Sequence, residues 1–226
     1  MNRLRWLLWK KGYGIVDRRL YLPDAWFSDE YKDKWKQCDI PEETKFQTKN
    51  EIASEMINNI VSNGIFQVKW IGCDAAFGCD HKFLKSIPKD VYYFASVREN
   101  ELIFPFMPQM NIPENEAGKN GRRYKHARPS IALISVKSFA KDDSIPWVKT
   151  VLAEGTKGLI IADVKCIRCV SCASTTKYGN YVAPEEEIWL YIRKYADGTI
   201  KYFVSNAPSN IDTAVLNKVS TMLSRM

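Results

Sequence analysis

Two groups of residues in this sequence have the type and spacing for chemistry. Asp74 follows a mostly apolar run over residues 65–73, and the second group is the C-x₂-C-x₂-C run of Cys166, Cys169 and Cys172. A carboxylate at the carboxyl end of a buried strand lies where open α/β sheets place their ligand sites. Aspartate is also a common turn former and helix cap, so its position alone leaves both interpretations of Asp74 open.

Each group predicts a different metal. Asp74 suits Mg²⁺, but a two-metal site for phosphoryl transfer needs several carboxylates, so Asp74 requires partners. The three cysteines could give thiolates to Zn²⁺ or to an iron-sulfur cluster. Their fourth ligand would come from Cys73, Cys79 or His81, which lie beside Asp74 in the sequence. The alternative is that the cysteines are small residues of a strand or turn.

The charge balance favours a polyanionic partner, with nucleic acid as the first candidate. The chain has 33 Lys and Arg against 26 Asp and Glu, a net charge of +7 and a pI near 9.0. Basic residues interleaved with aromatic ones suit phosphates and bases together, although a solvated charged face is the alternative. The candidate DNA-binding residues form two clusters: Arg3, Arg5, Lys10 and Lys11, and Lys119, Arg122, Arg123, Lys125 and Arg128.

Composition narrows the class of protein. At 46% hydrophobic and 26% charged residues over 226 positions, the chain predicts a globular protein with a sizeable core. Six cysteines are too sparse for a secreted disulfide scaffold, and the apolar run Trp6–Trp9 is too short for a signal peptide or a membrane span. We therefore expect a cytoplasmic protein with reduced thiols and no membrane partner.

The hydrophobic pattern predicts an α/β sheet with crossover connections. Thr48 to Glu51 reads as a capping box that begins a helix, and Asn63-Gly64 ends it. Residues 48–97 then read as helix, strand, helix and strand, with strands at 65–73 and 91–97. Before them, a strand is expected within residues 13–22 and a helix at 28–37, capped by Ser28.

The second half of the chain is predicted to be rich in strands. Short strands are expected at 131–136, 147–152 and 158–166. A hairpin is expected from the runs 188–192 and 200–204, joined across Asp197-Gly198. A last helix is expected from about Thr213.

Six motifs, in order along the chain, carry a resemblance to a known family. They are Asp17–Pro23, Ala25–Phe27, Lys45–Lys49, Asp74–Gly78, Glu154–Gly158 and Val204–Pro208. Together they resemble the DDE superfamily endonuclease domain of bacterial insertion-sequence transposases, over residues 10 to 222. The resemblance implies an α/β fold, a partial RNase H-like mixed sheet flanked by helices with a β-rich insertion.

The resemblance also implies a reaction and a division into regions. Members of this family use two Asp and one Glu around divalent metal, normally Mg²⁺, to cleave DNA and join its freed end to a target. Asp74 matches the second catalytic Asp. The expected regions are a partial RNase H-like core at 1–100, a β-rich insertion with the basic loop and the hairpin at 101–210, and a truncated C-terminal helix at 211–226.

Departures from the family pattern predict a transposase fragment, truncated at both ends. The first catalytic Asp has no counterpart, because Asp17 lies inside a later motif. The Arg-Trp-x-Ile-Glu helix expected soon after Met222 is absent, and no acid follows Asp212. We expect an isolated chain that is inactive unless an intact transposase chain supplies the missing carboxylates, and a protein of marginal stability.

Two alternatives from other classes stay open at this point. The first is a non-catalytic DNA-binding polypeptide that needs only the two basic clusters. The second is a module that binds zinc or an iron-sulfur cluster through Cys166, Cys169 and Cys172.

Overall fold

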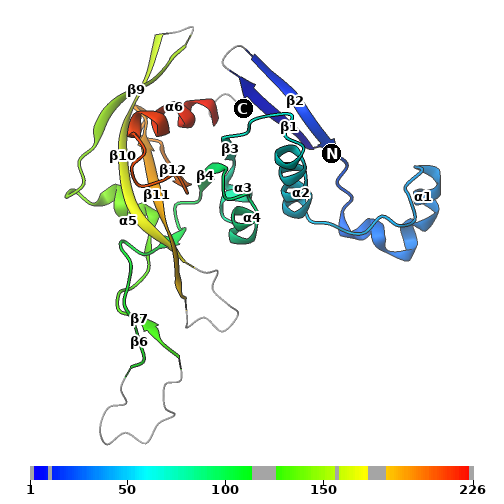
Figure 1. Cartoon of the computed structure of the whole chain (residues 1–226), viewed down its shortest axis with the longest axis horizontal. Coiled ribbons are helices and arrows are strands. Elements are labelled where there is room, and N and C mark those ends of the chain that lie inside the picture. Colours follow the sequence, from blue (N-terminus) through cyan, green and yellow to red (C-terminus); the bar gives the residue numbers. More distant parts are fainter. Residues whose placement is uncertain (1–2, 10–11, 114–125, 156–157, 173–181, 224–226) are drawn as a thin grey trace, which may run out of the picture. The chain divides into compact units, whose positions relative to one another are not determined.

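The predicted elements are divided between two units of structure. The structure, a computed structural model, describes residues 3–9, 12–113, 126–155, 158–172 and 182–223. One unit comprises residues 1–67 with 86–88, and the other comprises residues 68–85 with 89–226. Figure 1 labels the elements along the chain.

The first unit begins with a hairpin and a run of short helices. Strand β1 (Arg3–Trp9) pairs antiparallel with β2 (Gly12–Arg19), which contains most of the strand expected at 13–22. Two 3₁₀ helices, η1 (Asp24–Phe27) and η2 (Asp29–Tyr31), precede α1 (Lys32–Gln37). The expected helix at 28–37 was therefore right only in its second half. Ser28 does not cap it, because the Ser28 hydroxyl donates to the carbonyl of Ala25 at 2.8 Å.

Helix α2 (Lys49–Ser62) confirms the predicted capping box. The hydroxyl of Thr48 accepts from the Glu51 N–H at 3.2 Å, and the Glu51 carboxylate accepts from the Thr48 N–H at 2.7 Å. Gly64 follows the helix with a φ of +65°, in the left-handed region that favours glycine. The buried residues of the helix repeat every three to four positions and are Ile52, Ala53, Met56 and Ile57.

The second unit is built on one mixed sheet of six strands, in the order β3-β4-β12-β11-β10-β9. Strand β3 (Trp70–Cys73) runs parallel to β4 (Tyr92–Val97), and every other neighbouring pair in the sheet is antiparallel. The connection from β3 to β4 contains α3 (Ala75–Gly78) and α4 (His81–Lys85). The expected strand at 65–73 forms only over its last four residues.

The remaining strands come from the second half of the chain. They are β9 (Val148–Gly155), β10 (Gly158–Cys172), β11 (Pro184–Lys194) and β12 (Ile200–Ser205). The β11–β12 hairpin turns across Asp197-Gly198 as expected, with Gly198 at a φ of +83°. Strand β10 runs beyond the expected end at Cys166 and contains the whole cysteine run. Helix α6 (Thr213–Leu223) starts where it was predicted.

Short elements lie between β4 and β9. Strands β5 (Leu102–Ile103) and β8 (Ile134–Ser135) pair with each other, as do β6 (Met110–Asn111) and β7 (Arg128–Pro129). The expected strand at 131–136 forms only at Ile134–Ser135. Residues 131–133 are not strand, and Val136 begins helix α5 (Val136–Lys141). The N–H groups of Val136 and Lys137 donate to the carbonyls of Glu101 and Glu99 instead of extending the β5–β8 pair.

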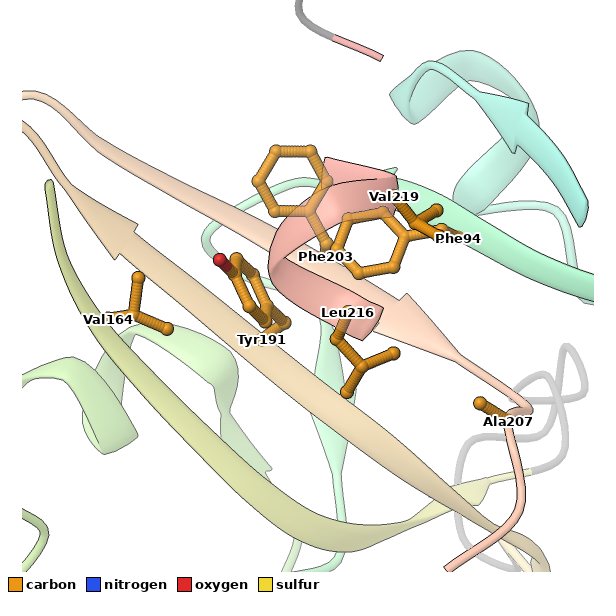
Figure 2. Close-up of a cluster of buried hydrophobic side chains, with 7 residues drawn as sticks. All are labelled: Phe94, Val164, Tyr191, Phe203, Ala207, Leu216 and Val219. Carbon is orange, nitrogen blue, oxygen red and sulfur yellow. The ribbon is translucent and has the colours of Figure 1, made fainter. Parts of the chain in front are cut away.

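Helix α6 packs on one face of the sheet and closes its core (Figure 2). Phe94 lies among Tyr191 and Phe203, with ring centroids 5.3 Å and 5.1 Å away. Leu216 and Val219 of α6 belong to the same buried cluster. The Tyr191 hydroxyl donates to Asn217 at 2.8 Å, which fixes the helix over the strands. This mixed α/β arrangement agrees with the predicted fold class and is compatible with an RNase H-like fold.

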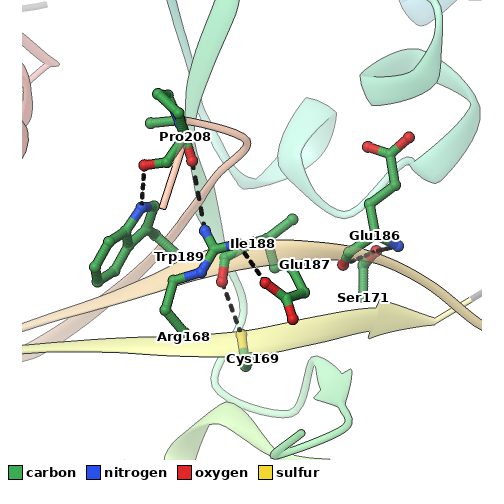
Figure 3. Close-up of polar contacts among 9 residues, drawn as sticks. Arg168, Cys169, Ser171, Glu186, Glu187, Ile188, Trp189 and Pro208 are labelled. Carbon is green, nitrogen blue, oxygen red and sulfur yellow. Dashed lines mark hydrogen bonds and ion pairs between the residues drawn. The ribbon is translucent and has the colours of Figure 1, made fainter. Parts of the chain in front are cut away.

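The motif Val204–Pro208 comprises the last two residues of β12 and the turn after it, where polar contacts hold it (Figure 3). The guanidinium of Arg168 donates to the carbonyl of Ala207 at 3.4 Å and to Glu187 at 3.1 Å, and it lies over the ring of Trp189. The indole N–H of Trp189 donates to the carbonyl of Pro208 at 3.1 Å. Side chains of β10 and β11 therefore attach the motif to the sheet through its carbonyl groups.

Candidate functional site

Asp74 lies at the carboxyl end of β3 and is exposed. Cys73 pairs with Ala95, and because β3 and β4 are parallel, the carboxyl ends of both strands lie at the same edge of the sheet. The side chain of Asp74 also caps α3, since its Oδ1 accepts from the Ala76 N–H at 2.9 Å. The helix-cap interpretation is thus correct, and the carboxylate still faces solvent at the edge where α/β sheets place ligands.

The backbone after Asp74 forms two short helices in succession, α3 and α4. The Phe77 and Gly78 N–H groups donate to the Asp74 carbonyl at 3.1 Å and 2.8 Å. Asp80 then starts α4, because its Oδ1 accepts from the N–H groups of Lys82 and Phe83 at 2.9 Å and 3.1 Å. These local bonds give the segment that carries Asp74 its shape.

His81 and Glu101 form a polar pair beside this segment. His81 Nε2 lies 3.1 Å from Glu101 Oε1, and both side chains are largely buried. The hydrogen bond that the Glu101 carboxylate accepts raises the pKa of His81 above its ordinary value, against the effect of burial. Sequence reasoning missed Glu101, since it lies 20 residues from His81 and no local pattern links the two.

The three cysteines of the run lie in separate surroundings along β10. Cys166 packs against the core cluster that includes Leu216 of α6. The Cys169 thiol donates a hydrogen bond to the carbonyl of Ile188, and Cys172 belongs to a second buried cluster with Phe104. Burial raises the pKa of Cys166 and of Cys169 to about 12 and that of Cys172 to about 11. Because the three thiols lie in separate surroundings along one strand, the structure supports the alternative of small strand residues. It gives the zinc or iron-sulfur hypothesis no support.

The candidate fourth ligands do not join that run. Cys73 is buried in β3, and Cys79 accepts a hydrogen bond from the Arg98 N–H at 3.4 Å. Burial raises the pKa of the Cys79 thiol. Across the described residues, no group of three or more His, Cys, Asp or Glu side chains is arranged to hold a metal ion. Asp74 thus belongs to no such group in the part of the chain that the structure describes.

Most of the predicted DNA-binding residues fall outside the description. Lys10, Lys11, Lys119, Arg122, Arg123 and Lys125 lie outside the described residues. Arg3 and Arg5 belong to β1, and Arg128 is a partly buried residue of β7, in the other unit. DNA binding by these residues stays a prediction. None of the helices in the described residues is long and apolar enough to cross a membrane.

Comparison with known proteins gives one match. The family model described as DDE superfamily endonuclease matches residues 10–158, which is more than half of the chain and includes Asp74. Neither the curated proteins nor the solved structures contain a match. An exposed aspartate at the carboxyl edge of a mixed sheet, inside a match of this length, leads to one conclusion: the chain belongs to the DDE superfamily endonuclease family.

Proposed function

We propose that this chain acts on DNA in the cytoplasm during transposition, as a DDE-type component in which Asp74 is a ligand to Mg²⁺. The observation that carries this proposal is the exposed Asp74 carboxylate at the carboxyl edge of β3, within the family match. The family reaction is DNA cleavage by water and then strand transfer. In cleavage, a new bond forms between water oxygen and phosphorus while the bond from phosphorus to the 3′ oxygen breaks. The water gives up a proton and the leaving oxygen becomes a 3′-hydroxyl. In the second step this hydroxyl attacks the target phosphodiester. Its oxygen loses the proton and bonds to phosphorus, while the bond from that phosphorus to the target 3′ oxygen breaks and that oxygen takes up a proton.

The donor set of the chain fits the metal in part. A bound divalent metal supplies activation of the attacking oxygen and stabilisation of the leaving oxygen. Mg²⁺ is held through one or two carboxylates together with substrate phosphates, rather than by a cage of protein ligands. Asp74 provides one such carboxylate. We propose that DNA phosphates complete its metal shell, and that cleavage further requires carboxylates from an intact transposase chain bound to this one.

This assignment is tested by Mn²⁺, used as a paramagnetic substitute for Mg²⁺ in the NMR spectrum of the chain with a short DNA duplex. We expect the amide signals of Asp74 to Phe77 to broaden at lower Mn²⁺ concentration than other signals, and Asp74→Asn to remove this effect. Asp197→Asn is the matched control. Asp197 is also exposed and accepts from an N–H two residues on, that of Thr199, at 2.8 Å.

Two results would contradict the assignment. The first is equal broadening around Asp74 and Asp197, which indicates nonspecific attraction of the cation to surface carboxylates. The second is an Asp74→Asn variant that responds to Mn²⁺ like the unaltered chain.

DNA binding by the basic clusters gives a separate prediction. Because Lys and Arg release counterions from the phosphates that they neutralise, the affinity for a duplex should fall steeply with salt. If five of the nine candidate residues engage, the slope of log affinity against log salt is about −4.5. Filter binding or fluorescence anisotropy over a range of salt concentrations measures it, with EDTA present to exclude metal bridging. A slope near zero would rule out phosphate neutralisation by these clusters.

A further inference from the structure

Gly78 is packed directly against the backbone of β4. A Cβ built at Gly78 would lie 2.0 Å from the carbonyl oxygen of Ser96 and 3.1 Å from the Cβ of Ala95. Real Cβ atoms do not approach other atoms to 2.0 Å, and a backbone carbonyl in a paired strand cannot rotate away as a side chain can. Only glycine therefore fits between α3 and β4 at this position.

The position of Gly78 is coupled to that of Asp74 through the backbone. The Gly78 N–H donates to the Asp74 carbonyl at 2.8 Å, so the two residues close a single helical turn. That turn is also held by the Asp74 carboxylate, which accepts from Ala76. A shift of Gly78 away from Ser96 therefore moves the residue that carries the carboxylate.

The other end of the same segment is attached by polar contacts. Cys79 accepts from the Arg98 N–H at 3.4 Å, and His81 pairs with Glu101 at 3.1 Å. Arg98 and Glu101 both lie in the turn that follows β4. The α3–α4 segment is thus attached to β4 and to the turn after it from Gly78 to His81.

We propose that Gly78 and His81 are positioning residues for Asp74, which fix its carboxylate at the carboxyl edge of the sheet. This inference rests on the proposed function of Asp74 as a metal ligand. Neither residue touches metal or DNA in this scheme. Each acts by holding the α3–α4 segment against β4, so that the Asp74 carboxylate meets a metal ion in one fixed place.

The test compares Gly78→Ala with Gly14→Ala, using the Mn²⁺ and duplex titration described above. Gly14 has open space where a Cβ would lie and an ordinary φ, so it is a glycine of the same chain without the close contact. We expect Gly78→Ala to raise the Mn²⁺ concentration needed to broaden the Asp74 amide signal by about tenfold, since partners that orient a metal ligand have effects of this order. Gly14→Ala should leave it unchanged.

Spectra recorded without Mn²⁺ distinguish failure of the positioning inference from failure of the proposed function. In Gly78→Ala, the amide shifts from Asp74 to Gly78 should change while those of α6 stay in place. Unchanged shifts and an unchanged Mn²⁺ response in a folded Gly78→Ala variant would overturn the positioning inference. A wild-type chain without a selective response at Asp74 would instead contradict the proposed function, and the metal-free shifts would still decide whether Gly78 fixes Asp74.

His81→Leu is the second test variant, for use if Gly78→Ala does not fold. Leucine has no donor, so this variant removes the hydrogen bond to Glu101 and leaves the buried contact at Gly78 intact. We expect the Mn²⁺ concentration needed to broaden the Asp74 amide signal to rise less than in Gly78→Ala. A folded His81→Leu variant with the wild-type Mn²⁺ response would contradict the inference, because loosening the segment would then have no effect on the carboxylate.

Discussion

Replacement of Phe94 by alanine is expected to lower the free energy of unfolding by about 3–5 kcal/mol. Phe94 is fully buried in β4, and its ring contacts those of Tyr191 and Phe203 beneath α6. Truncation removes most of a buried aromatic side chain and leaves a cavity that the strands on either side cannot close. Urea denaturation followed by circular dichroism measures the loss.

The control for this variant is Phe106→Ala. Phe106 is 61% exposed, so its truncation should change stability by less than about 0.5 kcal/mol. Because native proteins are only about 5–15 kcal/mol more stable than their unfolded chains, Phe94→Ala can lose its fold, and Phe94→Leu then serves as the milder variant. Equal losses at positions 94 and 106 would show that the cluster in Figure 2 does not stabilise the sheet.

The Lys165→Met variant is expected to lose about 2–4 kcal/mol of unfolding free energy, because it removes the hydrogen bonds of a buried ammonium group. Lys165 is 1% exposed, and its Nζ donates to the carbonyls of Phe139, Ala140 and Asp142 at 3.3, 3.2 and 2.6 Å. These carbonyls lie at the C-terminal end of α5, where helical N–H partners run out. Their other backbone bonds are long, since the Asp142 N–H donates to Phe139 and the Ile145 N–H to Asp142, each at 3.4 Å. A cation there also offsets the helix dipole.

Methionine keeps an apolar stem at position 165 and removes the ammonium, so the variant separates the polar contacts from packing. Those contacts are the three carbonyls and the Trp147 ring, whose centroid lies 4.6 Å from Nζ. The matched control is Lys201→Met, because Lys201 is exposed on β12 and its loss should be close to neutral. Thermal or urea denaturation of the two variants side by side gives the difference. A Lys165→Met variant as stable as Lys201→Met would mean that solvent satisfies the α5 carbonyls.

The sequence predicted correctly those elements that are determined by residues close together in the chain. The capping box of Thr48 and Glu51 and the turn at Asp197-Gly198 each combine residues within a few positions of one another, and the structure contains both. Asp74 was found in the same way, from the apolar run before it. Such signals need no knowledge of the rest of the fold.

The elements that the sequence did not reveal depend on distant partners. Strand β10 was expected to end at Cys166, and it continues through Arg168 to Cys172. The structure buries Lys165 by placing the end of α5 over it, and it covers Arg168 with Trp189 and the turn after β12. The pairing of His81 with Glu101 is likewise visible only once β4 has brought them together. The extent of the DNA surface stays a prediction, since most of its residues lie outside the described part of the chain.

The strand order has a consequence for how the chain is synthesised. Strand β4 pairs with β12, and the Asn206 side chain accepts from the Tyr93 N–H across 113 residues of sequence. The ribosome must therefore synthesise the chain through β12, which ends at Ser205, before β4 acquires its second neighbour. Until then one edge of the strand beside Asp74 is open to other nascent chains, and long-range pairing of this kind is slow. The side of β4 that pairs with β12 is thus among the last parts of the sheet to form.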